Sequence, residues 1–148
     1  MKINQRGIDL IKRFEGCELE AYQDLVGKWT IGYGHTKNVN EGMRITEDQA
    51  ERMLAEELKE FEDYINKYVT VDLEQNQFDA LTSWVYNLGP TNLRRSTMLK
   101  VLNAGKYTEV PYQMKRWNRA GGRVSKGLTR RRKAEARLFE DIDEQSDK

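Results

Sequence analysis

Two carboxylates and a hydroxyl follow one another at short intervals near the start of the sequence. Asp24 comes nine residues after Glu15, and Thr30 comes six residues after Asp24. Glycosidic bond cleavage needs such a set, because one protonated carboxyl gives the leaving oxygen a proton while an ionised carboxylate activates water or stabilises positive charge at the sugar carbon. We expect Glu15, which follows Phe14 on an apolar helix face, to be partly desolvated, and Asp24 to be charged in a polar turn.

The spacing by itself leaves a plainer interpretation open. The chain has 24 acidic residues, so two carboxylates at this separation are also typical of a solvated surface. Asp24 would then be an ordinary turn former.

The surrounding residues predict the elements that position this set. Apolar residues at three- and four-residue spacing indicate an N-terminal helix that ends near Gly16. Strand formers punctuated by glycines indicate a hairpin unit between residues 19 and 36. Thr46 and Gln49 form a capping-box pattern before a helix over 47–67. That helix would be about 30 Å long, enough to join two lobes.

The second half of the chain predicts shorter helices. An apolar stripe that begins at Phe78 ends at Gly89, and Ser96 could cap a further helix. Two more are expected over 108–117 and 129–142. The sum is an α+β fold in one domain over residues 1–148, with a cleft between its lobes. We assign a β lobe at about 15–45, a connecting helix at about 47–67, a helical lobe at about 70–142 plus the N-terminal helix, and a frayed tail at 143–148.

Composition and residue counts exclude several classes of protein. With 148 residues, 38% of them hydrophobic and 33% charged, the chain has the make-up of one globular domain with a charged exterior. No stretch approaches the roughly 18 apolar residues of a membrane span, so we expect no transmembrane segment and no cleavable signal. A lone Cys17 cannot close an intramolecular disulfide, and one histidine with one cysteine cannot make a usual zinc site. We therefore expect no metal and no cofactor.

The net charge of +1 hides an uneven distribution. Residues 44–74 carry 4 basic and 10 acidic side chains, whereas residues 94–137 carry 14 basic and 2 acidic ones. Such a basic surface is compatible with a nucleic-acid binder. However, the segment lacks the pattern of a recognition helix, zinc finger or RNA-binding sheet, and nucleic-acid binding would leave the carboxylates and the hydroxyl without a role. We expect no nucleic-acid partner.

Three strings of the sequence resemble one known family, in the same order. The first runs from Phe14 to Thr36: a Glu, eight intervening residues, an Asp, five intervening residues and a Thr, followed by Ile-Gly-Tyr-Gly-His. The others lie at residues 76–89 and 116–132. They resemble the phage-type lysozymes, the endolysins of glycoside hydrolase family 24, and the resemblance covers about residues 3–139.

The resemblance implies a lysozyme-like fold and a role for each residue of the first string. Glu15 would be the general acid, Asp24 would orient or activate water and offset the oxocarbenium charge, and Thr30 would help to hold that water. Inversion at the sugar carbon is implied, and a water-mediated route corresponds to carboxyl groups roughly 6.5 to 9.5 Å apart.

The same resemblance implies a second group of residues around the catalytic set. His35 is expected to be a structural hydrogen-bond or ion-pair partner. Gly34 resembles a position where the backbone approaches the sugar. Further candidates for lining the groove, with ordinary capping roles as the alternative, are Ser96, Thr97 and Asn118.

The implied activity is that of a muramidase, which hydrolyses the β-1,4 bond between N-acetylmuramic acid and N-acetylglucosamine in peptidoglycan and lyses the bacterial host. A lytic transglycosylase and a non-catalytic wall-binding protein are the alternatives, and the pair Asp24 and Thr30 favours hydrolysis. We expect a monomer that stays in the host cytoplasm until a holin releases it to the periplasm and cell wall. There its basic half would be attracted to the anionic envelope.

Overall fold

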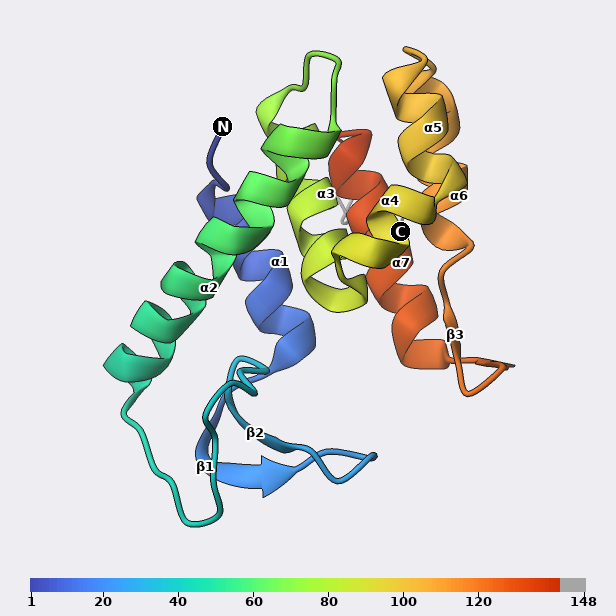
Figure 1. The fold of residues 1–148 in the computed structure, drawn as a ribbon. Helices are drawn as coiled ribbons and strands as arrows, with labels where there is room; N and C mark the ends of the chain where they lie inside the picture. Colours follow the sequence, from blue (N-terminus) through green and yellow to red (C-terminus); the bar gives the residue numbers. More distant parts are fainter. Residues whose placement is uncertain (142–148) are drawn as a thin grey trace.

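The computed structural model describes residues 1–141. Near the N-terminus, strands β1 (Glu18–Gln23) and β2 (Trp29–Gly32) form an antiparallel hairpin in which Tyr22 lies opposite Thr30. The register is irregular between Glu18 and Tyr22, and Glu20 makes an isolated bridge to Arg44 on the returning chain. This small β lobe lies at the bottom of Figure 1, apart from most of the helices.

The long helix α2 (Glu47–Tyr68) connects the β lobe to the rest of the molecule, as Figure 1 shows. Its first turn is fixed by a capping box, because the Thr46 hydroxyl accepts a hydrogen bond from the Gln49 N–H and the Gln49 side chain accepts one from the Thr46 N–H. The observed helix coincides with the one predicted over 47–67. Its apolar face includes Leu54 and Leu58, which pack with Ile11 in a small core of their own.

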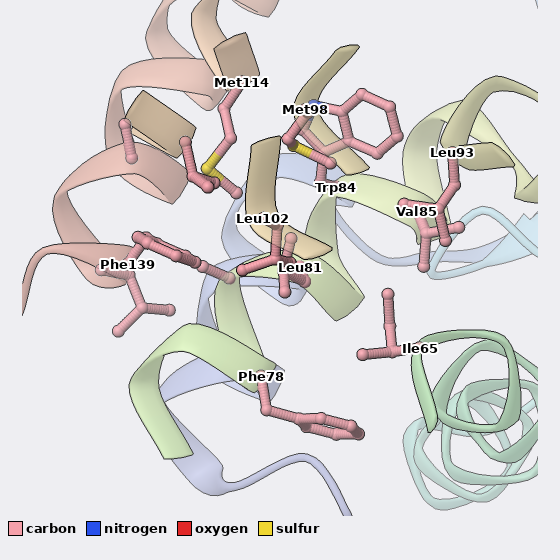
Figure 2. Packing of buried hydrophobic residues seen from close by; sticks show 14 of the residues in the cluster. Ile65, Phe78, Leu81, Trp84, Val85, Leu93, Met98, Leu102, Met114 and Phe139 are labelled. Carbon is pink, nitrogen blue, oxygen red and sulfur yellow. The ribbon is translucent and has the colours of Figure 1, made fainter. Parts of the chain in front are cut away.

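The helical lobe is built around α3 (Gln75–Leu88), which packs against α1 (Gln5–Glu15), α2 and α7 (Lys126–Phe139). The remaining elements are α4 (Pro90–Arg95), α5 (Thr97–Asn103), the 3-10 turn η1 (Tyr107–Glu109), α6 (Val110–Lys115) and a short hairpin of β3 (Arg119–Ala120) and β4 (Arg123–Val124). Figure 2 shows Trp84 and Leu81 of α3 surrounded by buried side chains of α4, α5, α6 and α7. Burying this many apolar side chains is the main source of the lobe's stability.

The predicted α+β class, with a hairpin lobe and a helical lobe joined by a long helix, is confirmed. Two local predictions were incomplete. Pro90 begins α4 directly after Gly89 ends α3, so the stop signal is also a start signal. A hairpin occupies residues 119–124, between the helices expected over 108–117 and 129–142, where no strands were predicted.

The last helix differs from its prediction at both ends. Ser125 caps α7 through the Leu128 N–H, so the helix begins at Lys126, three residues before the predicted position 129. It ends at Phe139, and the predicted extension to 142 and the tail at 143–148 lie outside the described residues. Within residues 1–141, none of the helices has the length and apolar character needed to cross a membrane.

Candidate active site

Glu15 is the last residue of α1, where the chain leaves the helical lobe for the β lobe. Its side chain is 19% exposed, and Oε2 lies 2.7 Å from Nη1 of Arg131 in α7. We predicted an apolar, partly desolvated setting from the neighbouring Phe14. The structure does bury most of the side chain, but it pairs the carboxylate with a guanidinium instead of leaving it against apolar groups.

Arg131 is itself held by a buried polar cluster on α3 and α7. Its Nε lies 3.2 Å from Oε2 of Glu135, and its Nη2 donates to the Ser83 carbonyl at 3.2 Å. The Ser83 hydroxyl donates to the same Glu135 oxygen at 2.6 Å. Burial raises the pKa of Glu135, and the charges of Arg132 and Arg131 oppose that rise. The guanidinium that faces Glu15 is therefore held in place by Glu135 and by the Ser83 carbonyl.

Gly34 approaches the other oxygen of the Glu15 carboxylate. Its φ of +84° lies in the region that favours glycine, and a Cβ placed on it would lie 2.7 Å from Glu15 Oε1. Any larger residue would therefore push into the carboxylate. Gly34 of the β lobe and Arg131 of the helical lobe together confine both oxygens of Glu15.

Asp24 and Thr30 are joined through the backbone of Lys28 in the turn of the first hairpin. The Asp24 Oδ1 accepts hydrogen bonds from the N–H groups of Val26 at 3.0 Å and Lys28 at 2.8 Å. The Thr30 hydroxyl is buried and donates to the Lys28 carbonyl at 3.0 Å. This turn fixes the orientation of both side chains relative to each other.

The charges of both predicted catalytic carboxylates influence the phenol of Tyr22 in β1. It stands opposite Thr30 across the hairpin. Burial raises the pKa of the Tyr22 phenol, and the negative charges of Glu18, Glu15 and Asp24 raise it further. Our sequence reasoning gave Tyr22 no role.

His35 lies against α2, where its Nδ1 contacts Oε1 of Glu57. The other oxygen of Glu57 accepts a hydrogen bond from the Tyr86 hydroxyl at 3.1 Å, and that hydroxyl also lies 2.8 Å from the Tyr33 carbonyl oxygen. Burial raises the pKa of Tyr86, and the charge of Glu57 adds to that effect. This chain of contacts ties the β lobe to α2 and α3.

Two cavities contain Glu15 in their linings. The first, which we call the main cleft, has a volume of about 730 Å³ and is lined by Glu15, Gly34, His35, Thr36, Lys37, Arg52, Met53, Glu56, Glu57, Glu60, Phe61, Tyr86 and Asn87. The second, which we call the basic cavity, has a volume of about 620 Å³ and is lined by Arg13, Phe14, Glu15, Asn87, Ser125, Gly127, Leu128, Arg130 and Arg131. Both are lined by Glu15 and Asn87. Those two residues therefore mark the point where the cavities meet.

Three residues predicted to line the groove lie in other surroundings and line neither cavity. Ser96 is buried and caps α5, because it accepts a hydrogen bond from the Leu99 N–H and donates one to the Leu93 carbonyl. Thr97 is exposed as the first residue of α5. Asn118 is half-buried and donates to the Thr129 hydroxyl at 3.0 Å. Asp24 and Thr30 also lie outside the linings of these two cavities.

Sequence reasoning missed Asn87 and Arg131. Arg131 and Arg132 belong to a run of basic residues that we interpreted as surface, yet both are buried. A helix-period signal was present, because Glu135 follows them at four and three residues and pairs with both. Asn87 carried no local signal. Its Oδ1 accepts a hydrogen bond from Arg132 Nη2 at 2.7 Å.

The fold and the site define a class of protein. A hairpin lobe, a long connecting helix and a helical lobe enclose a cleft with a confined carboxylate, and this arrangement is typical of a lysozyme-type glycoside hydrolase. Residues 12–135 match the family described as Phage lysozyme. The chain belongs to that family.

Individual relatives and solved structures agree with this assignment. The chain is 45% identical over 144 residues to an endolysin of Acyrthosiphon pisum secondary endosymbiont phage 1, covering 95% of this chain and 99% of the relative. An endolysin structure from Escherichia coli O157:H7 phage FAHEc1 has a TM-score of 0.89 at 42% identity and covers 95% of this chain and 94% of its own. The muramidase domain of SpmX from Asticaccaulis excentricus has a TM-score of 0.87 at 39% identity, with 93% and 97% covered.

The relatives also differ in length. The chain spans about half the length of the endolysins of two Bacillus phages, B103 and PZA, to which it is 43% and 44% identical.

Proposed function

We propose that this chain is an endolysin muramidase that hydrolyses the β-1,4 bond between N-acetylmuramic acid and N-acetylglucosamine in peptidoglycan and thereby lyses the bacterial host. One observation carries the proposal: Glu15 lies where two cavities meet, with both carboxylate oxygens confined. A glycan strand that passes from one cavity into the other would place a glycosidic oxygen next to this carboxyl group.

Glu15 is the general acid of the proposed mechanism. It gives its proton to the glycosidic oxygen as the bond to the sugar carbon breaks, and it is left as a carboxylate. The Arg131 guanidinium, 2.7 Å from Oε2, stabilises that carboxylate as its charge develops. Because Arg131 is fixed by Ser83 and Glu135, the guanidinium does not have to reorient during the step.

Asp24 and Thr30 bind and activate the attacking water molecule in the proposed mechanism. The turn leaves the second oxygen of Asp24 available, since the two turn N–H groups both bind Oδ1. That oxygen activates or orients a water molecule and offsets the positive charge on the sugar, while the Thr30 hydroxyl oxygen helps to hold the water. Attack from the face opposite Glu15 inverts the configuration at the sugar carbon.

Gly34 and Asn87 are the substrate-binding residues that the geometry favours. Gly34 brings backbone next to Glu15 without a side chain in the way. Asn87 has its carbonyl oxygen fixed by Arg132, which can only donate, so its amide NH₂ is the group left to donate toward a sugar oxygen where the cavities meet. His35 supports the wall of the main cleft through Glu57.

Replacement of the general acid tests the proposal. We expect Glu15→Gln to lower the release of reducing muramic acid ends from purified peptidoglycan by at least about a hundredfold, because general acid catalysis contributes about 10² to 10⁴. The matched control is Glu20→Gln, which removes an exposed carboxylate of the β lobe that pairs only loosely with Arg44. Circular dichroism verifies that both variants fold.

Three outcomes contradict the proposal. Unchanged cleavage by Glu15→Gln would exclude the general acid, and unchanged behaviour on cell walls without any cleavage would indicate a wall-binding protein. Anhydromuramic ends in place of reducing ends, identified by mass spectrometry of the products, would indicate a lytic transglycosylase.

We further propose the route by which the enzyme reaches its substrate. The protein accumulates as a monomer in the host cytoplasm and passes to the periplasm and cell wall when a holin opens the inner membrane. The 14 basic and 2 acidic residues in 94–137 support attraction to the anionic envelope once the protein has been released.

A further inference from the structure

Tyr22 lies on the same face of the first hairpin as Thr30 and Asp24. Tyr22 and Thr30 are direct partners across β1 and β2, and the side chains of such a pair share one face of a sheet. Asp24 comes two residues after Tyr22, and the pairing continues there, because the Asp24 N–H donates to the Lys28 carbonyl at 2.9 Å. Alternate residues of a strand project to the same side, so all three side chains begin on one face.

The two members of the cross-strand pair differ in exposure. Thr30 is 4% exposed, whereas Tyr22 is 39% exposed. The Tyr22 ring is therefore the part of this pair that a molecule approaching the face would contact.

The hydroxyl of Tyr22 is a donor without a protein acceptor in the described part of the chain. No hydrogen bond to residues 1–141 holds it, in contrast to the hydroxyls of four other tyrosines, which are bonded within the protein: Tyr33, Tyr64, Tyr86 and Tyr107. Burial raises the pKa of the Tyr22 phenol, and the charges of Glu18, Glu15 and Asp24 raise it further. The phenol therefore stays protonated and able to donate.

The substrate of the proposed reaction offers acceptors for such a donor. A phenol combines an apolar ring with a polar tip, and a sugar presents hydroxyl and ring oxygens that accept hydrogen bonds. In the proposed mechanism, the water held by Asp24 and Thr30 attacks the anomeric carbon of N-acetylmuramic acid. This sugar is therefore the one that lies over the face on which Tyr22 stands.

We propose that Tyr22 is a substrate-binding residue whose hydroxyl donates a hydrogen bond to an oxygen of the N-acetylmuramic acid unit and so holds that sugar over the attacking water. The inference rests on the proposed function. It goes beyond that function because it adds a residue of β1 to the substrate-binding set and names the sugar that this residue binds.

Replacement by phenylalanine tests the contact, because Tyr22→Phe removes the hydroxyl and keeps the ring opposite Thr30. Binding is measured by isothermal titration calorimetry with soluble glycan strands freed of stem peptides by an amidase, in a Glu15→Gln background in which cleavage is too slow to interfere. We expect Tyr22→Phe to weaken binding by about threefold to tenfold, the size of one neutral hydrogen bond. In the active enzyme, kcat/KM on the same strands should fall by a similar factor.

The matched control is Tyr112→Phe. It removes the hydroxyl of an exposed tyrosine on α6, a residue that lines neither cavity. Binding and kcat/KM of Tyr112→Phe should equal those of the parent proteins, and urea denaturation verifies that both variants fold.

The outcomes separate the inference from the function. Unchanged binding and kcat/KM in Tyr22→Phe, or an equal loss in Tyr112→Phe, overturns the sugar contact while the hydrolase stands. A shift of the acid limb of kcat/KM to higher pH in Tyr22→Phe also overturns it, because that shift would mean that the hydroxyl stabilises the ionised form of Asp24 instead of binding the sugar. Cleavage by Glu15→Gln at the wild-type rate overturns the proposed function itself.

Discussion

Replacing Gly34 by alanine tests how tightly the catalytic carboxylate is confined. At φ +84°, an alanine costs about 1 to 2 kcal/mol of unfolding free energy, because its Cβ approaches the following carbonyl oxygen. The new Cβ would also lie 2.7 Å from Glu15 Oε1, whereas ordinary van der Waals contact begins at 3.4 Å. The carboxylate must therefore move by roughly 0.7 Å, and displacements approaching 1 Å at a reacting group cost about a hundredfold in rate.

Gly42 provides the matched control. Its φ of +83° is almost the same, but a Cβ placed there meets nothing within 4 Å. Gly42→Ala should therefore lose the same 1 to 2 kcal/mol, measured by urea denaturation, and keep its lytic rate. Gly34→Ala should lose at least that stability and about a hundredfold in kcat on purified peptidoglycan.

The comparison between the two variants tests whether the contact between residue 34 and Glu15 positions the general acid. If Gly34→Ala lyses cell walls as fast as Gly42→Ala does, the contact with Glu15 does not position the general acid. If both variants lose activity in proportion to stability, backbone strain alone explains the effect.

Two other properties of the molecule should respond to pH and salt. Burial raises the pKa of Asp79, although its Oδ1 accepts hydrogen bonds from the Asn4 N–H and the Gln75 side chain. A raised pKa in the folded state favours the protonated form, so the contribution of this carboxyl to stability is present at low pH and is lost as pH rises above the ordinary pKa of an aspartate, about 3.9. Asp79→Asn should therefore gain stability relative to the wild type as pH rises through that range in urea denaturation, and a constant difference would contradict the burial effect. Lysis of whole cell walls should slow as ionic strength rises from about 0.01 M to 1 M, because the Debye length falls from about 30 Å to 3 Å, and an unchanged rate would argue against attraction by the basic surface.

The elements that could be predicted are those whose signals are local. The signals for α2 all lie in one short stretch of sequence, namely the capping box at Thr46 and Gln49 and the apolar stripe that follows it. The predicted bounds of this helix differ from the observed ones by one residue. The cap at Ser96 likewise identified α5. The hairpin at 119–124 was missed because its two glycines resemble a simple break, and its pairing covers only two residues in each strand.

The residues of the candidate site likewise differ in whether a local sequence signal identifies them. Glu15, Asp24 and Thr30 fall within sixteen residues, so one motif contains all three. Arg131 is 116 residues from Glu15, and no local pattern links the two. The basic run at 130–133 looked uniform as a sequence, but helix geometry buries Arg131 and Arg132 against Glu135 and leaves Arg130 and Lys133 exposed.

The position of the general acid depends on both lobes at once. Oε1 of Glu15 faces Gly34 of the β lobe, and Oε2 pairs with Arg131 of the helical lobe. A shift of one lobe against the other would therefore loosen one side of the carboxylate or crowd the other. The contacts of Glu57 with His35 and Tyr86 oppose such a shift, because they join the β lobe to α2 and α3 beside the same cleft. In this molecule, the packing between lobes is thus part of what orients the proton donor.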